Sequence, residues 1–183
     1  MSAEDRRFAP LGGRTIYEGR IIDLEIKRFR YADGDEVERE VVHHKGAAAA
    51  LAHDDDHVWL VRQPRETVGD PDFLEIPAGR LDKEGESPLD AARRELAEEV
   101  GLRAANWEPI ASFASSVGVM DEMVHVFHAT DLSEVDGGTP ETDENERIEI
   151  IRWPLADLDG AIAATRDAKS LVGLLWLRAR GIA

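Results

Sequence analysis

Residues 79–102 read GRLDKEGESPLDAARRELAEEVGL, and the second half of this stretch has the pattern of a capped, amphipathic helix. Ser87 suits the N-cap, Pro88 suits the first helical position, and Gly101 suits a left-handed turn after the last one. Apolar residues recur at helical spacing between them, at Leu89, Ala92, Leu96 and Val100. The stretch therefore predicts one helix that begins at Pro88, ends before Gly101 and packs by its apolar face.

Three acidic residues on this predicted helix are the chemically informative feature of the chain. Glu95, Glu98 and Glu99 stand at positions i, i+3 and i+4, so they fall on one helical face. Like charges that close destabilise a helix unless something neutralises them, and a hard divalent cation such as Mg²⁺ prefers carboxylate oxygens. Just before the stretch, residues 76–79 (IPAG) have the pattern of a strand that ends in a glycine turn.

From Glu86 to Leu102 these residues resemble the Nudix hydrolase signature, G-x5-E-x7-R-E-U-x-E-E-x-G-U, where U is a bulky aliphatic residue. The departure is at the start, because six residues instead of five separate Gly79 from Glu86. An extra loop residue leaves the helix intact, so we interpret it as a tolerated insertion. The alternative interpretation is an ordinary acidic surface helix.

The resemblance implies a role for each acidic position. Glu95 and Glu99 would be the principal metal ligands, with Glu98 assisting through a second ion or a bridging water and so counting among the catalytic residues. The backbone carbonyl of Ala78 would be a further ligand, and the expected ion is Mg²⁺, with Mn²⁺ as the alternative. Arg94 would pair with Glu86 and hold the loop against the helix. Such a site suits attack of water on a pyrophosphate.

Features outside the signature are similar to the ADP-ribose pyrophosphatase branch of this family. They are a short N-terminal strand segment, residues 61–65 (VRQPR), residues 75–79 (EIPAG), and residues 116–122 (SVGVMDE), where Val117 replaces the usual proline. The branch assigns a general base to the loop glutamate, which corresponds here to Glu122. It also implies substrate contacts by Arg28, Arg62 and Glu75. N-terminal strands that are exchanged between subunits in relatives imply a homodimer.

The expected architecture follows from this resemblance and from local patterns. Residues 22–26 alternate as a half-buried strand, Asp33-Gly34 suits a hairpin turn, and residues 36–42 suit the returning strand. We expect a small antiparallel β segment at residues 1–45. A Nudix domain would follow at residues 46–183, an α+β fold with a mixed sheet between helices (an α/β/α sandwich).

Within the second domain, local sequence patterns predict some strands and helices clearly and leave one segment ambiguous. Residues 46–52 (GAAAALA) favour a helix by propensity, whereas the resemblance places a strand there, which we follow. Strands are expected at residues 58–61, 110–113, 123–129 and 148–153. Helices are expected at residues 154–165 and 169–180, and the last is apolar on nearly every side and therefore buried.

The amino-acid composition excludes some classes of binding partner. The net charge is −16, which disfavours nucleic acid and anionic membranes because both bind basic surfaces. The chain has no cysteine, no apolar run of 18 residues and no signal-peptide pattern at its start, so we expect a cytoplasmic protein. The histidines lack metal-ligand spacing.

The leading hypothesis is an Mg²⁺-dependent enzyme that converts ADP-ribose and water to AMP and ribose 5-phosphate. One alternative keeps this chemistry with another nucleoside diphosphate sugar as the small-molecule substrate. A second alternative is a non-catalytic Nudix sensor that binds ADP-ribose, although the complete acidic set argues against it. A shorter class, hydrolases of oxidised nucleoside triphosphates, is disfavoured by the extra N-terminal segment.

Overall fold

The structure is a computed structural model, which describes residues 4, 6–135 and 147–182. By their contacts, the residues separate into two compact units. The first comprises Met1–Lys45 and Ala114–Met123, and the second comprises Gly46–Phe113 and Val124–Ala183. A loop from the middle of the chain therefore belongs to the N-terminal unit, which the sequence pattern did not indicate.

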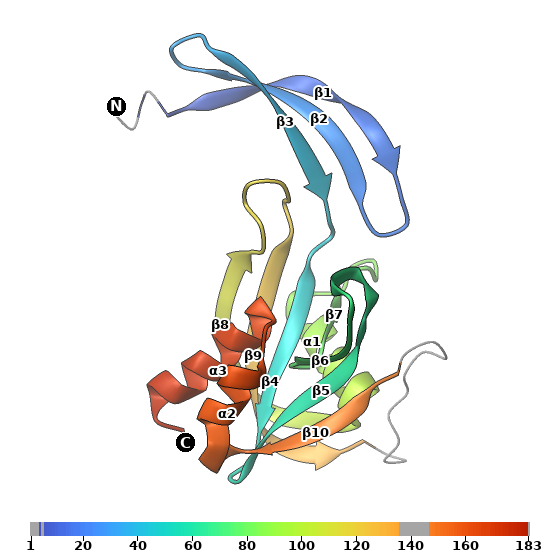
Figure 1. The fold of residues 1–183 in the computed structure, drawn as a ribbon, viewed down its shortest axis with the longest axis vertical. Helices are drawn as coiled ribbons and strands as arrows, with labels where there is room; N and C mark the ends of the chain where they lie inside the picture. The colour runs from blue at the N-terminus through green and yellow to red at the C-terminus, as the bar shows by residue number, and fades with distance from the viewer. Residues whose placement is uncertain (1–3, 5, 136–146, 183) are drawn as a thin grey trace. The chain divides into compact units, whose positions relative to one another are not determined.

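The first unit is built on a three-stranded antiparallel sheet in the order β1-β2-β3 (Figure 1). Its strands are β1 (Phe8–Glu18), β2 (Asp23–Tyr31) and β3 (Glu36–His43). The turn between β2 and β3 contains Gly34 at φ 98°, a left-handed conformation that glycine adopts without strain. The expected small antiparallel β segment is confirmed.

The second unit contains a mixed seven-stranded sheet with the central order β10-β5-β4-β9-β8. Its strands are β4 (Ala47–His53), β5 (His57–Arg65), β6 (Asp70–Glu75), β7 (Ala78–Arg80), β8 (Leu102–Ala114), β9 (Met123–Glu134) and β10 (Glu149–Pro154). β4 pairs in parallel with β9, whereas its other partners are antiparallel: β7 along its first half and β5 at its end. β6 pairs with β5.

Helices cover both faces of this sheet (Figure 1). The alternation along β4 shows how: Ala49 and Leu51 pack in the cluster that includes α2 (Leu158–Ala164) and α3 (Ala168–Arg180). Ala48, Ala50 and Ala52 face the other way, in the clusters that include α1 (Pro88–Val100). Two 3₁₀ turns, η1 (Glu66–Val68) and η2 (Leu155–Asp157), complete the elements. The expected α/β/α sandwich is confirmed.

The structure differs from local sequence patterns in three segments. The alanine-rich segment is a strand, as the resemblance implied and propensity did not. The expected strand at residues 76–79 is only half present: Ala78 and Gly79 belong to β7, whereas Ile76 and Pro77 link β6 to β7. The expected helix at residues 154–165 begins only at Leu158, after η2. Among the described residues, no helix is long and apolar enough to cross a membrane.

Candidate functional site

Helix α1 forms where the sequence predicted and buries its apolar face against the sheet. The Ser87 side chain accepts a hydrogen bond from the backbone N–H of Asp90, and Gly101 ends the helix at φ 74°. Ala91, Ala92, Leu96 and Val100 are buried against the sheet. Glu95 and Glu99 lie against β7, whereas Glu98 contacts Arg94 and Lys83.

Arg94 offsets part of the charge on this acidic face. Its Nε and Nη2 donate to the two oxygens of Glu86 at 2.9 and 3.0 Å, which is the predicted pair. Its Nη1 donates to Glu95 at 2.5 Å and to Glu98 at 2.8 Å. Hydrogen bonding from Arg94 holds the pKa of Glu86 below its usual value, although partial burial acts the other way. The guanidinium thus ties the loop before α1 to two of the three acidic side chains.

The short segment of residues 76–79 fixes the carboxylates from the other side. The backbone N–H of Ala78 donates to Oε2 of Glu99 at 3.0 Å, and Glu99 is only 5 % exposed. The Glu95 carboxylate lies directly against Cα of Gly79, where an added Cβ would be 1.8 Å from Oε1. Any residue other than glycine at position 79 would therefore displace the Glu95 carboxylate.

The donor set fits a hard divalent cation, because it offers three carboxylates and no soft ligand. Within residues 4, 6–135 and 147–182, no three acidic or histidine side chains converge at metal-binding distance. Glu95 and Glu98 instead turn toward Arg94, whose single positive charge offsets only part of the charge on the acidic face.

Two predicted substrate contacts in the second unit, Arg62 and Glu75, make ion pairs within the protein. Glu75 is 4 % exposed, and its oxygens accept hydrogen bonds of 2.6 Å from Arg65 and Lys169. Arg62 lies near two carboxylates, at 3.1 Å from Glu149 and 3.4 Å from Asp72. Glu75 is therefore placed to hold the end of β6 in position. The substrate contacts expected of Glu75 and Arg62 stay predictions.

In the first unit, the loop of residues 116–122 is fixed beside β3. The Val42 N–H donates to the Val119 carbonyl at 2.8 Å, and the Asp121 N–H donates to the Val42 carbonyl at 3.1 Å. Nδ1 of His44 lies 3.0 Å from Oε1 of Glu122, the predicted general base. This register places Glu122 in contact with an imidazole, a pairing that the sequence did not predict.

Asp121 anchors the same loop. Its carboxylate contacts Nδ1 of His43 and accepts the backbone N–H of His44. Burial alone would raise the pKa of Asp121, but these two interactions outweigh it and lower the pKa. The anionic form of Asp121 therefore stabilises the loop at neutral pH.

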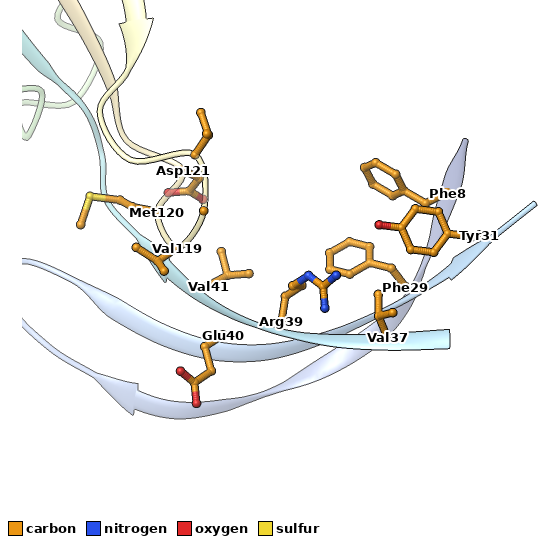
Figure 2. Close-up of a pocket in the computed structure, with 12 residues that line it drawn as sticks. Phe8, Phe29, Tyr31, Val37, Arg39, Glu40, Val41, Val119, Met120 and Asp121 are labelled. Carbon is orange, nitrogen blue, oxygen red and sulfur yellow. The ribbon is translucent and has the colours of Figure 1, made fainter. Parts of the chain in front are cut away.

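An open groove of about 400 Å³ lies in the first unit, between its sheet and this loop. Figure 2 shows aromatic side chains and one guanidinium along it, from Phe8, Phe29, Tyr31 and Arg39. Phe8 contacts Phe29 edge to face at 5.5 Å, and 62 % of Phe8 is exposed. Arg28, the remaining predicted substrate contact, is exposed on β2.

Sequence reasoning missed the residues that hold the 76–79 segment in place. They are Asp167, Lys169 and Ser170, at the start of α3. The D-A-K-S pattern is a recognisable helix N-cap, with Asp167 accepting the Ser170 N–H. No local pattern indicates their partners, which lie 94 residues earlier in the chain.

Comparison with known proteins agrees with this geometry. The chain is 40 % identical over 152 residues to an ADP-ribose pyrophosphatase of Mycobacterium tuberculosis, covering 82 % of this chain and 72 % of the relative. It is 36 % identical over 180 residues to an ADP-ribose pyrophosphatase of Bacillus subtilis, covering 97 % and 94 %. A crystal structure described as an ADP compounds hydrolase shares the fold, with a TM-score of 0.82 and 24 % identity over the full length of both chains.

The family assignment rests on the signature helix and on most of the chain around it. A model of the NUDIX domain matches residues 42–172, which include every strand of the mixed sheet and helices α1 and α2. The resemblance expected from the acidic motif is thereby confirmed, and the chain belongs to the Nudix family.

Proposed function

We propose that the protein is a pyrophosphohydrolase that converts ADP-ribose and water to AMP and ribose 5-phosphate. The observation that carries this proposal is the acidic face of α1, fitted against Ala78 and Gly79 and complete at all three glutamates. The shared name of the two relatives supports ADP-ribose as the substrate. An intact acidic set also argues for turnover rather than for binding alone.

Glu95, Glu98, Glu99 and the Ala78 carbonyl would hold the metal ion, which we propose to be Mg²⁺ with Mn²⁺ as a substitute. A bound ion of this kind offsets phosphate charge and polarises the P–O bond. The protein's own contribution is to fix the donors. Ala78 N–H orients Glu99, Gly79 accommodates Glu95, and Arg94 orders the loop through Glu86.

Glu122 is proposed as the general base that accepts a proton from the attacking water. An ionised carboxylate has two oxygens, so contact of Oε1 with His44 orients the group and leaves Oε2 to accept the proton. Water oxygen then bonds to one phosphorus, and the bond from that phosphorus to the bridging oxygen breaks. The two phosphomonoesters leave as products.

The first unit is proposed to contact the nucleoside end of the substrate and to form the interface of a homodimer. Its groove exposes aromatic rings, on which a base can stack, and a guanidinium, which can pair with phosphate. Arg28 and Arg62 are proposed as further cationic contacts for an anionic substrate. The negatively charged chain needs such local cations, and its composition favours a cytoplasmic location.

A substrate panel tests the proposal. The protein is assayed with Mg²⁺ and alkaline phosphatase on ADP-ribose, ADP-glucose, GDP-mannose, NADH, diadenosine polyphosphates and, with a phosphatase-free control, nucleoside triphosphates. Because alkaline phosphatase acts on the monoester products and not on intact diesters, phosphate release reports pyrophosphate cleavage. We expect the highest kcat/KM on ADP-ribose. A higher value on another compound would replace the substrate, and binding without turnover would indicate a sensor.

A further inference from the structure

The start of α3 binds the end of β6, which leads into Ala78 and Gly79 beside the candidate metal site. Ser170 is completely buried, and its hydroxyl accepts the backbone N–H of Ile76 at 2.7 Å. The same hydroxyl donates to Oδ2 of Asp167 at 2.5 Å, so Ser170 is engaged as both donor and acceptor. The Ile76 amide follows the last ladder residue of β6 and precedes β7, which leaves Ser170 as its acceptor.

A second connection joins the same two segments. Lys169 donates to Oδ2 of Asp167 at 2.9 Å and to Oε1 of Glu75 at 2.6 Å. Arg65 neutralises the other oxygen of Glu75. Consecutive residues of the strand end, Glu75 and Ile76, are therefore bound to α3, one by a charged pair and the other by a buried hydrogen bond.

The next residues join this segment to β4 and to the acidic helix α1. The Pro77 carbonyl accepts the N–H of Ala50 at 2.9 Å, Ala78 N–H donates to Glu99, and Gly79 contacts the Glu95 carboxylate. A backbone of only four residues, 76–79, thus links Ser170 to two of the proposed metal ligands. We expect displacement of Ile76 to shift these contacts, because only Pro77, whose ring fixes φ, separates Ile76 from Ala78.

We propose that Asp167, Lys169 and Ser170 are positioning residues for the metal site, acting through the backbone of residues 76–79. This inference rests on the proposed function for the identity of the metal ligands. It assigns Glu75 to the same positioning set, since its oxygens are bound to Arg65 and Lys169. Groups outside the ligand set commonly change metal affinity by about 10- to 100-fold when they are removed.

The test compares Ser170→Ala with Thr165→Val. Thr165 is also a buried hydroxyl residue, and its Oγ1 donates to the Ala161 carbonyl at 2.9 Å, at the end of α2 and within that helix's own backbone. Both variants lose one buried hydroxyl, but only Ser170 contacts the 76–79 segment. Mn²⁺ binding to the substrate-free proteins is measured by calorimetry, and the Mg²⁺ concentration for half-maximal ADP-ribose hydrolysis is measured separately.

We expect Ser170→Ala to weaken Mn²⁺ binding and raise the required Mg²⁺ about tenfold, whereas Thr165→Val stays within about twofold of wild type. Asp167→Asn, which retains an N-cap, serves if Ser170→Ala fails to fold, and it should weaken Mn²⁺ binding in the same direction. The inference is overturned if folded Ser170→Ala binds Mn²⁺ with unchanged affinity. If Ser170→Ala does not fold, unchanged Mn²⁺ affinity in Asp167→Asn overturns it.

Glu99→Gln separates this outcome from failure of the proposed function. If Glu99→Gln weakens Mn²⁺ binding and Ser170→Ala does not, only the positioning role is wrong. If Glu99→Gln binds Mn²⁺ like wild type, the metal assignment itself is wrong, and the inference falls with it. Equal losses in Ser170→Ala and Thr165→Val would show a general effect of lost packing and would also overturn the inference.

Discussion

Replacing Gly79 by alanine should abolish most of the activity while leaving the fold intact. The added Cβ would lie 1.8 Å from Oε1 of Glu95 and 2.1 Å from its Cδ, whereas ordinary van der Waals contact begins at 3.4 Å. The Glu95 carboxylate must therefore retreat by about 1.6 Å, the difference between 3.4 and 1.8 Å. Misplacement of about 1 Å in a catalytic constellation can cost roughly 100-fold in rate.

Stability should change little in the same variant. Gly79 is not among the glycines with positive φ, so alanine is compatible with its backbone. The displaced atoms are the far end of a flexible side chain, which moves at small cost. We expect kcat/KM for ADP-ribose to fall about 100-fold, with a Tm close to that of wild type.

Gly34→Ala is the matched control, because it should show the opposite pattern. Its Cβ would meet nothing within 4 Å, but its φ of 98° strains any residue with a side chain. We expect a loss of about 1 kcal/mol in unfolding free energy, with kcat/KM unchanged. Near-wild-type kcat/KM in Gly79→Ala would refute the reasoning about the Glu95 contact.

Three further predictions concern charge and pH. Arg94 holds the pKa of Glu86 below its ordinary value of 4.5, so the pair stabilises the protein above that pH. Glu86→Gln should lower the Tm at pH 7, and the deficit should vanish as the pH falls through the depressed value. Burial and neighbouring His53 hold the pKa of His128 below 6.5. As the pH drops, the unfolded chain therefore takes up the proton before the folded chain does, and the Tm should decrease as the pH is lowered from 6.5. His128→Gln should flatten that fall, and an unchanged slope would contradict the assignment. Glu122→Gln should lower kcat about 100-fold with little change in KM, and wild-type turnover would exclude Glu122 as the base.

Local sequence patterns predicted α1 and its acidic face because every determinant lies within one helix. The N-cap, the Pro88 start and the Gly101 end are each visible in the sequence and present in the structure. The pair between Arg94 and Glu86 was implied by the family resemblance, and it spans only eight residues. The placement of Glu95, Glu98 and Glu99 on one face, in contrast, follows directly from helix periodicity.

The alanine-rich strand β4 shows where local propensity fails. Alanine is the best helix former, yet Ala48–Ala52 are completely buried between helices on both faces of the sheet. Small side chains let α1 approach the strand closely, and this tertiary packing overrides propensity. Only the family resemblance predicted the strand.

Contacts between distant segments were beyond sequence reasoning. Glu75 was predicted to touch substrate, and no local pattern indicated that Arg65 and Lys169 bind its two oxygens. The contact of His44 with Glu122 joins residues from separate parts of the chain, whose proximity depends on the register of the loop beside β3. Such pairs follow from the fold and not from spacing.

Hydrolysis of ADP-ribose by the wild type and by Glu99→Gln, at saturating Mg²⁺, tests the central claim most directly. Glu99 is nearly buried and bound to the Ala78 N–H, and glutamine keeps its size while removing its charge. The measurement quantifies AMP and ribose 5-phosphate, with the Tm of each protein as the check on folding. We predict equimolar products from the wild type and a loss of at least about 100-fold in kcat for the folded variant. Equal turnover by both proteins would contradict the assignment of the acidic face of α1 as the hydrolytic centre.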